Sequence, residues 1–169
     1  ADVDALLACT VAGTEVTVND MITEKVAKIG EKIDVRRFAR YEGVNGTVDS
    51  YIHMGGKVGV LVLAEGEKNE TVAEVLHDVA LQIAAASPVA PEYVRRSEVR
   101  ADHLEHEKEI LAAQARNEGK PEKIIEKMVM GRVDKFYKEV CLLEQPFVKD
   151  PDMTVEKMIA AKAKGSDVI

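Results

Sequence analysis

The stretch Asn117-Glu118-Gly119-Lys120-Pro121 (NEGKP) interrupts a charged, helix-forming sequence that runs from Ser97 to Leu143. Glycine suits the left-handed position just past a helix end, and proline suits the first turn of the next helix. The pattern therefore predicts two helices joined by a tight turn. Each predicted helix carries one narrow apolar seam, which favours an antiparallel coiled coil projecting from a domain. The seam residues are Leu104, Leu111 and Ala115 in the first arm and Ile125, Val129, Val133, Phe136 and Val140 in the second.

The sequence that follows the second arm, CLLEQPFVKD (141–150), predicts where the hairpin ends. Pro146 lacks a backbone N–H, and its ring disfavours the helical conformation at Gln145, so the helix must stop before it. An aromatic and a β-branched residue, Phe147 and Val148, come directly after this stop. The pattern alone leaves two interpretations open: they pack into a core, or they are offered to a partner.

Upstream of the hairpin the periodicity of apolar residues changes from helical to alternating. Residues 34–41, 48–55 and 57–66 each predict a strand, and the turns between them, rich in Gly and Asn, predict an antiparallel three-stranded meander. The third run is apolar on both faces, which predicts a strand covered on both sides. Helices are predicted from a cap at Asn19 or Asp20 to residues 30–32, from Asn69 to Ser87, and from Asp152 or Thr154 to Gly165. Helices separate from a meander indicate the α+β class.

These elements suggest three regions. Residues 1–96 form an α+β core subdomain, with residues 1–20 as the remnant of a preceding segment. Residues 97–143 form the helical-hairpin insertion, and residues 144–169 return to the core with a truncated C-terminal end. The chain begins without methionine and ends on the apolar SDVI, which resembles the start of a strand, so we expect a fragment of a longer protein.

Composition limits the classes of function. The chain has 169 residues and a net charge of −7, which disfavours nonspecific nucleic-acid binding as its main role. No apolar run reaches the roughly 18 to 20 residues of a membrane-spanning helix, and no signal peptide is recognisable. Cys9 and Cys141 lie far apart without CxxC spacing. Two ordinary thiols of an intracellular protein are favoured over a disulfide or a metal pair.

Candidate chemical motifs are weak. His103 and His106 lie three apart on one predicted helix, but the HExxH pattern is absent and a solvated helix face is favoured. Gly55 and Gly56 lie between two strands, which is not the setting of a phosphate loop. His53, at a hairpin tip, is expected to be exposed, with a partner contact as the alternative. We therefore expect no catalytic residues, no metal and no cofactor, and a binding or regulatory protein rather than an enzyme.

Several longer segments are specific to one family. KIGEKIDVRRF, KVGVLV, DVALQIAA and the block NEGKPEKIIEKMVMGRVDKFYKEVCLLEQPFVKD, in this order, strongly resemble translation elongation factor Ts. The resemblance covers about Ile22 to Ile159. It implies a guanine-nucleotide exchange factor for elongation factor Tu (EF-Tu) with two α+β core subdomains and a helical hairpin inserted into the second. It also implies an allosteric mechanism, in which the factor binds GDP-bound EF-Tu, distorts the phosphate and magnesium site and releases GDP.

The resemblance also implies partner-binding residues. The second subdomain would touch the third domain of EF-Tu through Val58 and Gly59 and through Val148 and Lys149. Phe147 is then expected to be the core anchor that holds Val148 and Lys149. The helix that contains LQIAA would approach the nucleotide-binding domain. Many members of the family have histidine where this chain has Gln82, which keeps a hydrogen-bonding side chain but loses the ring.

Two departures from the family pattern matter for activity. The amino-terminal helical domain and the TDFV segment of the family, whose Asp-Phe wedges beside the magnesium site, do not occur in this sequence, nor does the carboxy-terminal tail. We therefore expect this polypeptide alone to accelerate GDP release only slightly. The expected partner is EF-Tu, GDP-bound and nucleotide-free, in the cytoplasm or in an organelle stroma or matrix, with no direct nucleic acid and no membrane. The alternative is a non-catalytic structural or dimerisation module that binds a partner, or forms a homodimer, through the hairpin.

Overall fold

The computed structural model describes residues 2–164. The chain divides into two compact units, Ala1–Arg40 and Tyr41–Ile169. The described residues form six α-helices and two small antiparallel sheets, which places the fold in the α+β class, as predicted. The predicted end of the last helix at Gly165 and the predicted strand start at residues 166–169 lie outside the described residues. The predicted domain boundaries at residues 96 and 143 stay predictions.

The first unit contains two helices, α1 (Val3–Leu7) and α2 (Val18–Ile29). The predicted cap of α2 at Asn19 or Asp20 is wrong by two or three residues, because Thr17 is the N-cap. Its hydroxyl accepts from the Asp20 backbone N–H at 3.1 Å, and the Asp20 side chain accepts in return from the Thr17 backbone N–H. This is a capping box, with Asp20 as its third helical residue. Gly30 ends α2 in the left-handed conformation at φ 79°, as predicted.

The strand predicted over residues 34–41 is absent. Residues 33–43 have no regular secondary structure, and the sheet that follows has two strands instead of the three of a meander. The alternation of apolar side chains in DVRRFARY is genuine, but alternation does not supply a neighbouring strand. Phe38 and Tyr41 are partly exposed, so burial does not fix this segment in an extended, paired form.

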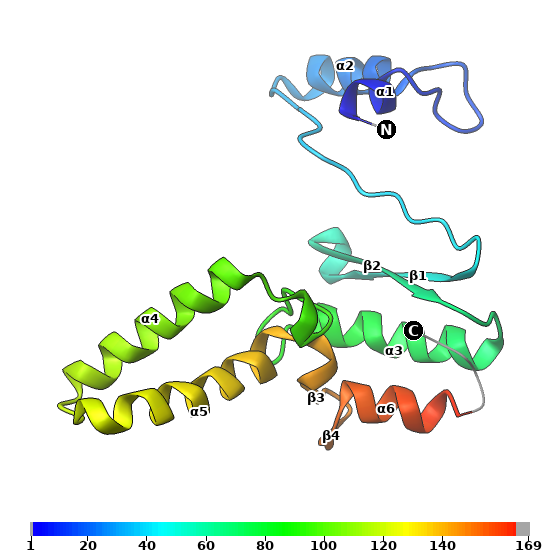
Figure 1. Ribbon diagram of the computed structural model, residues 1–169. Helices are drawn as coiled ribbons and strands as arrows, with labels where there is room; N and C mark the ends of the chain where they lie inside the picture. Colours follow the sequence, from blue (N-terminus) through cyan, green and yellow to red (C-terminus); the bar gives the residue numbers. More distant parts are fainter. Residues whose placement is uncertain (1, 165–169) are drawn as a thin grey trace. The chain divides into compact units, whose positions relative to one another are not determined.

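The second unit begins with the hairpin of β1 (Gly46–His53) and β2 (Val58–Glu65), joined through the 3₁₀ turn η1 (Met54–Gly56). Their register pairs Tyr51 with Val60 and Asp49 with Val62. Helix α3 (Glu70–Ala85) covers the face that carries these residues (Figure 1). The opposite face, with Leu61 and Leu63, is partly exposed. The prediction that the 57–66 strand is covered on both faces is therefore wrong for the described residues.

The core lies around α3. Asn69 is the N-cap of this helix, as predicted, and its side chain accepts from the Val72 N–H at 2.8 Å. One of its faces packs on the β1–β2 hairpin, and α6 (Val155–Lys162), capped by Thr154, lies on the other side (Figure 1). The short strands β3 (Pro146–Phe147) and β4 (Asp150–Thr154) lead into α6. The buried members of this core are Val62, Ala64, Val75, Leu76, Val79, Ala80, Leu142, Phe147, Val155 and Met158.

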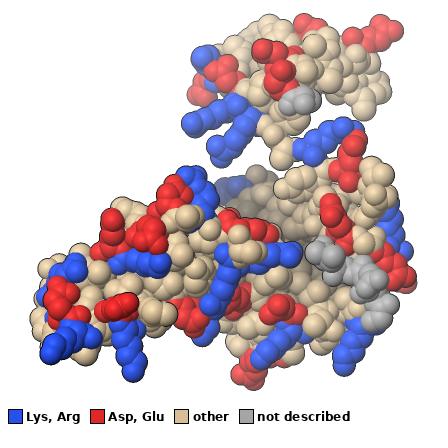
Figure 2. Space-filling view, viewed as in Figure 1, with Lys and Arg blue, Asp and Glu red and all other residues tan. Residues whose placement is uncertain are grey.

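The two helices predicted on either side of the NEGKP turn are confirmed. Helices α4 (Ala101–Asn117) and α5 (Glu122–Val140) extend from the core and are joined at Gly119, whose φ of 72° is left-handed (Figure 1). The predicted seam is buried between them: Leu111, Ala115, Ile125, Val129 and Val133 form one cluster, with Leu104 against it. On the face of the hairpin seen in Figure 2, acidic and basic side chains are interspersed. Such a surface is typical of a solvated pair of helices.

The two ends of the hairpin meet at its base. The Tyr93 backbone N–H donates to the Val140 carbonyl at 3.1 Å, and the Leu142 N–H donates to the Tyr93 carbonyl at 2.9 Å. The short 3₁₀ turns η2 (Arg96–Glu98) and η3 (Leu142–Glu144) flank this contact. The segment that enters α4 and the segment that leaves α5 are therefore fixed to each other by backbone hydrogen bonds.

Candidate functional site

The stretch that follows α5 forms an exposed turn on a buried anchor. Phe147 is 4% exposed and belongs to the core, whereas its neighbour Val148 is 38% exposed. Phe147 pairs with Asp150 across β3 and β4, so Val148 and Lys149 are the two residues of the turn. The prediction that Phe147 anchors the exit while Val148 is accessible is confirmed at the level of burial.

The exposed turn (Val148–Lys149) is held from beneath by Gln82 of α3. The Val148 backbone N–H donates to Gln82 Oε1 at 2.7 Å, and Gln82 Nε2 donates to the Pro146 carbonyl at 3.2 Å. The Gln82 side chain is fully buried. It bonds the backbone on both sides of Phe147 and so fixes the path of the chain there.

Lys149 is held by the same helix. Its Nζ lies 2.6 Å from Oδ1 of Asp78, and Lys162 Nζ of α6 lies 2.6 Å from the other oxygen, Oδ2. Asp78 is one helical turn from Gln82, so both point from the same face of α3. Burial alone raises the pKa of Asp78, but its hydrogen bonds and charge interactions with Lys149 and Lys162 outweigh burial, and the net pKa lies below the ordinary value. The carboxylate therefore stays ionised at neutral pH.

Val58 and Gly59, the other two predicted contacts, lie at the start of β2, opposite His53 and Ile52. Val58 is 37% exposed, and a Cβ on Gly59 would meet no atom within 4 Å, so both positions are open to a partner. They lie on the sheet side of α3, whereas β3, β4 and their turn lie on the side of α6 (Figure 1). The structure thus brings together Gln82, Val148 and Lys149 but places Val58 and Gly59 elsewhere.

Three residues of this site were missed by the sequence reasoning: Asp78, Gln145 and Lys162. A signal existed for Asp78, because polar residues four apart, Asp78 and Gln82, interrupt the apolar stripe of α3. No comparable signal marked Gln145, which is fully buried and donates to the Glu139 carbonyl at 2.7 Å and to the Val89 carbonyl at 2.9 Å.

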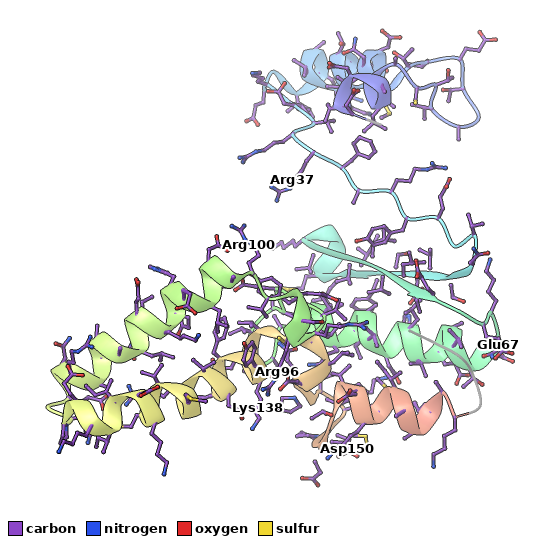
Figure 3. All side chains as sticks on the ribbon, in the orientation of Figure 1. Arg37, Glu67, Arg96, Arg100, Lys138 and Asp150 are labelled. Carbon is purple, nitrogen blue, oxygen red and sulfur yellow. The ribbon has the colours of Figure 1, made fainter. Side chains whose placement is uncertain are left out.

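The base of the hairpin is fixed by Arg96, which lies where the hairpin joins the core (Figure 3). Its guanidinium binds both oxygens of Glu144 and, at 2.8 Å, Oδ1 of Asp134. It also lies over the Tyr137 ring, 4.6 Å from the centroid. The hydrogen bonds to Glu144 raise the pKa of Arg96 above its usual range. Arg96 thus joins the entering segment, α5 and the exit turn η3.

Of the remaining candidate groups, His103 has structural partners. His103 is hydrogen-bonded to the Tyr93 hydroxyl at 2.8 Å and packs edge-on against Phe136. Among the described residues, no three His, Cys, Asp or Glu side chains are grouped to hold a metal ion. Both cysteines are free. No described helix is both long and apolar enough to cross a membrane.

The fold and this site define a small α+β domain with an inserted helical hairpin and a rigidly supported surface turn. The family model described as elongation factor TS matches residues 1–169. The chain therefore belongs to the elongation factor Ts family.

Curated relatives with this name agree. The chain is 54% identical over 156 residues to elongation factor Ts of Clostridioides difficile strain 630, a match that covers 90% of this chain and 50% of the relative. It is 52% identical over 151 residues to elongation factor Ts of Clostridium botulinum strain Alaska E43, covering 89% and 49%. For Clostridium perfringens strain SM101 the identity is 49% over 163 residues, covering 96% and 52%. The chain spans about half the length of the curated relatives it matches.

Proposed function

We propose that this chain is the EF-Tu-binding region of a guanine-nucleotide exchange factor that acts in translation elongation. The observation that carries the proposal is the family match along all 169 residues. The rigidly held exposed turn supports it, because this turn is one of the parts of the described surface that the family resemblance assigns to the partner. The site of action is the cytoplasm, or the stroma or matrix of an organelle.

The proposed mechanism is differential binding. An exchange protein that binds nucleotide-free EF-Tu more tightly than GDP-bound EF-Tu weakens GDP binding. The affinity for GDP falls by the same ratio as the two affinities for the exchange protein differ, because the equilibria are linked. No covalent step, cofactor or metal held by this chain is needed, and the protein is not an enzyme in the chemical sense. Its task is to present a surface of fixed shape.

The proposed contact surface has two parts. Val148 supplies apolar area and Lys149 supplies the methylene groups of its side chain, on a turn whose backbone is already fixed by Gln82. Because the turn is ordered before binding, little conformational entropy is lost when the complex forms. Val58 and Gly59 form the second part, where the open space at Gly59 admits a close backbone approach.

The proposal is tested by titrating the chain into nucleotide-free EF-Tu and into GDP-bound EF-Tu in a calorimeter, with labelled-GDP release measured in parallel. We expect tighter binding to nucleotide-free EF-Tu, and slower GDP release than a full-length family member produces at the same concentration. Equal affinity for the two forms, or no binding, would overturn the exchange-factor role. Release that matches the full-length factor would overturn the expected weakness of this chain.

The second candidate is a structural or dimerisation module that acts through the hairpin, whose helices we propose to supercoil as a coiled coil. The observation that favours it is the exposure of apolar side chains on α5, where Met130 is 70% and Ile124 is 44% exposed. Sedimentation equilibrium separates the two candidates. A dimer that is lost in a Met130→Lys variant, together with binding to EF-Tu that does not depend on nucleotide, supports the module.

A further inference from the structure

Two glutamine side chains, Gln82 and Gln145, lie fully buried next to each other in the core. Gln82 Nε2 donates to Gln145 Oε1 at 3.2 Å, although the two residues are 63 positions apart in the sequence. Burying an amide is costly unless its donors and its acceptor all find partners. Both amides do so here: they bond each other, and their other partners are backbone groups of segments that meet at this point.

Gln145 is oriented by the base of the hairpin. Its Nε2 donates to the Glu139 carbonyl at 2.7 Å and to the Val89 carbonyl at 2.9 Å. Glu139 lies in the last turn of α5, where carbonyls lack partners within the helix. An amide has two donors on nitrogen and an acceptor on oxygen. With both donors engaged by carbonyls, Gln145 can present only its oxygen to Gln82.

The orientation of Gln145 determines that of Gln82. Because Gln145 presents an acceptor, Gln82 must turn its Nε2 toward it, and Nε2 also donates to the Pro146 carbonyl. Oε1 of Gln82 then faces the other way, where it accepts from the Val148 N–H at 2.7 Å. A flipped Gln82 amide would set N–H against N–H at Val148 and oxygen against oxygen at Gln145.

We propose that Gln82 and Gln145 are positioning residues, which transmit the placement of the hairpin base to the exposed turn that contacts EF-Tu. The inference rests on the proposed function. It differs from the expectation that Gln82 itself approaches the partner, because Gln82 is fully buried beneath the turn. The two amides act through Val148: they hold its backbone in the binding conformation before the partner arrives.

The test uses Gln82→Met and Gln145→Met, which keep side-chain length and remove the hydrogen-bonding groups. NMR hydrogen exchange of the Val148 amide reports the position of the turn, and calorimetry with nucleotide-free EF-Tu reports affinity. In Gln82→Met we expect the exchange rate of the Val148 amide to rise about tenfold. We expect the Kd for nucleotide-free EF-Tu to rise by about the same factor, which corresponds to the loss of one buried hydrogen bond. Gln145→Met should change both quantities in the same direction, although Gln145 bonds neither residue of the turn.

Two further variants separate positioning from general stability. Val72→Ala opens the core at the opposite end of α3 and should lower the melting temperature with unchanged affinity. Gln82→His keeps one ring acceptor and one donor, so it should restore protection and affinity to within about threefold of the original chain. Gln82→His also tests the positioning role if a methionine variant does not fold.

The outcomes distinguish this inference from the proposed function. Faster exchange of the Val148 amide with unchanged affinity, or unchanged exchange in both methionine variants, would overturn the positioning role. An affinity loss in Val72→Ala as large as that in Gln82→Met would do the same. If the original chain does not bind EF-Tu, the proposed function is wrong. In that case hydrogen exchange of the Val148 amide in the methionine variants still shows whether the two glutamines hold the turn.

Discussion

The Asp78 carboxylate binds the ammonium group of Lys162 at 2.6 Å and thereby joins α3 to α6. The same carboxylate holds Lys149 in the exposed turn, so one buried acid connects three elements of the core. Lys149 and Lys162 are each about half exposed and keep contact with water. The two ammonium groups thus stabilise the buried carboxylate without being fully desolvated themselves.

Replacing Asp78 by asparagine should destabilise the chain. The amide keeps the shape of the side chain but removes the negative charge that two lysines bind, and we expect a loss of about 2 kcal/mol in the free energy of unfolding. Urea denaturation followed by circular dichroism measures it. Asp134→Asn, which changes an exposed carboxylate in α5, is the control and should lose less. Equal losses would contradict a special role for Asp78.

The same carboxylate should make stability depend on pH. Because the pKa of Asp78 is lower in the folded chain than its ordinary value of 3.8, its contribution is fully present above pH 3.8 and is lost as the pH falls through the folded pKa. The difference in stability between the original chain and Asp78→Asn should therefore be constant near neutral pH and shrink below about pH 4. A difference that stays constant down to pH 2 would argue against the ionised pair.

Val148→Asp should separate binding from stability. Val148 is 38% exposed on a turn whose backbone is held by Gln82, so a charge there can remain hydrated in the free chain. At an apolar contact with EF-Tu the same charge must be desolvated, and we expect the Kd to rise by tenfold or more, about 1.4 kcal/mol at least. Calorimetry and thermal melting check the two quantities. Parallel losses of affinity and melting temperature would show that Val148 acts as a core residue and not as a partner contact.

Arg96 should stabilise the hairpin base through its shape as well as its charge. Arg96→Ala should cost about 1 kcal/mol, a modest value because the side chain is half exposed and its ion pairs are screened by solvent. Arg96→Lys should recover little, because an ammonium group cannot bind both Glu144 oxygens and stack on Tyr137 at once. Thermal melting of both variants tests this. Full recovery by lysine would show that charge alone suffices.

The two thiols should differ sharply in reactivity. Cys9 is exposed, whereas Cys141 is fully buried and desolvation raises its pKa to about 11. At pH 8 only about one Cys141 side chain in a thousand would be a thiolate. A disulfide reagent should therefore modify Cys9 quickly and Cys141 only in denaturant. A Cys9→Ser variant should then show no rapid phase. Rapid labelling of that variant would mean that the core around Cys141 opens readily.

The sequence predicted the helical elements well because their signals are local. Asn69, Gly30 and Gly119 act through their own conformation or through the nearest N–H groups, so a single stretch of sequence suffices. The strand predicted at 34–41 failed because pairing depends on a neighbour that alternation does not reveal.

The candidate site was predicted only in part for a similar reason. The apolar segment after Pro146 left both core packing and partner contact open, and only the family resemblance separated a buried Phe147 from an accessible Val148. The Gln82 and Gln145 pair joins positions 63 apart, and a polar residue gives no sign of being buried until its distant partners are known. This is why the sequence suggested Gln82 only as a partner contact, through the family resemblance, and why Gln145 was overlooked.

The backbone contact between Tyr93 and Leu142 has a consequence for how the chain is assembled. A segment whose two ends are already in contact can be shortened or exchanged without disrupting the domain to which it is attached. The hairpin is therefore a module in the engineering sense, and its length can change independently of the domain. The junction between the hairpin and the domain cannot change freely, because Arg96 and Gln145 bind the hairpin there.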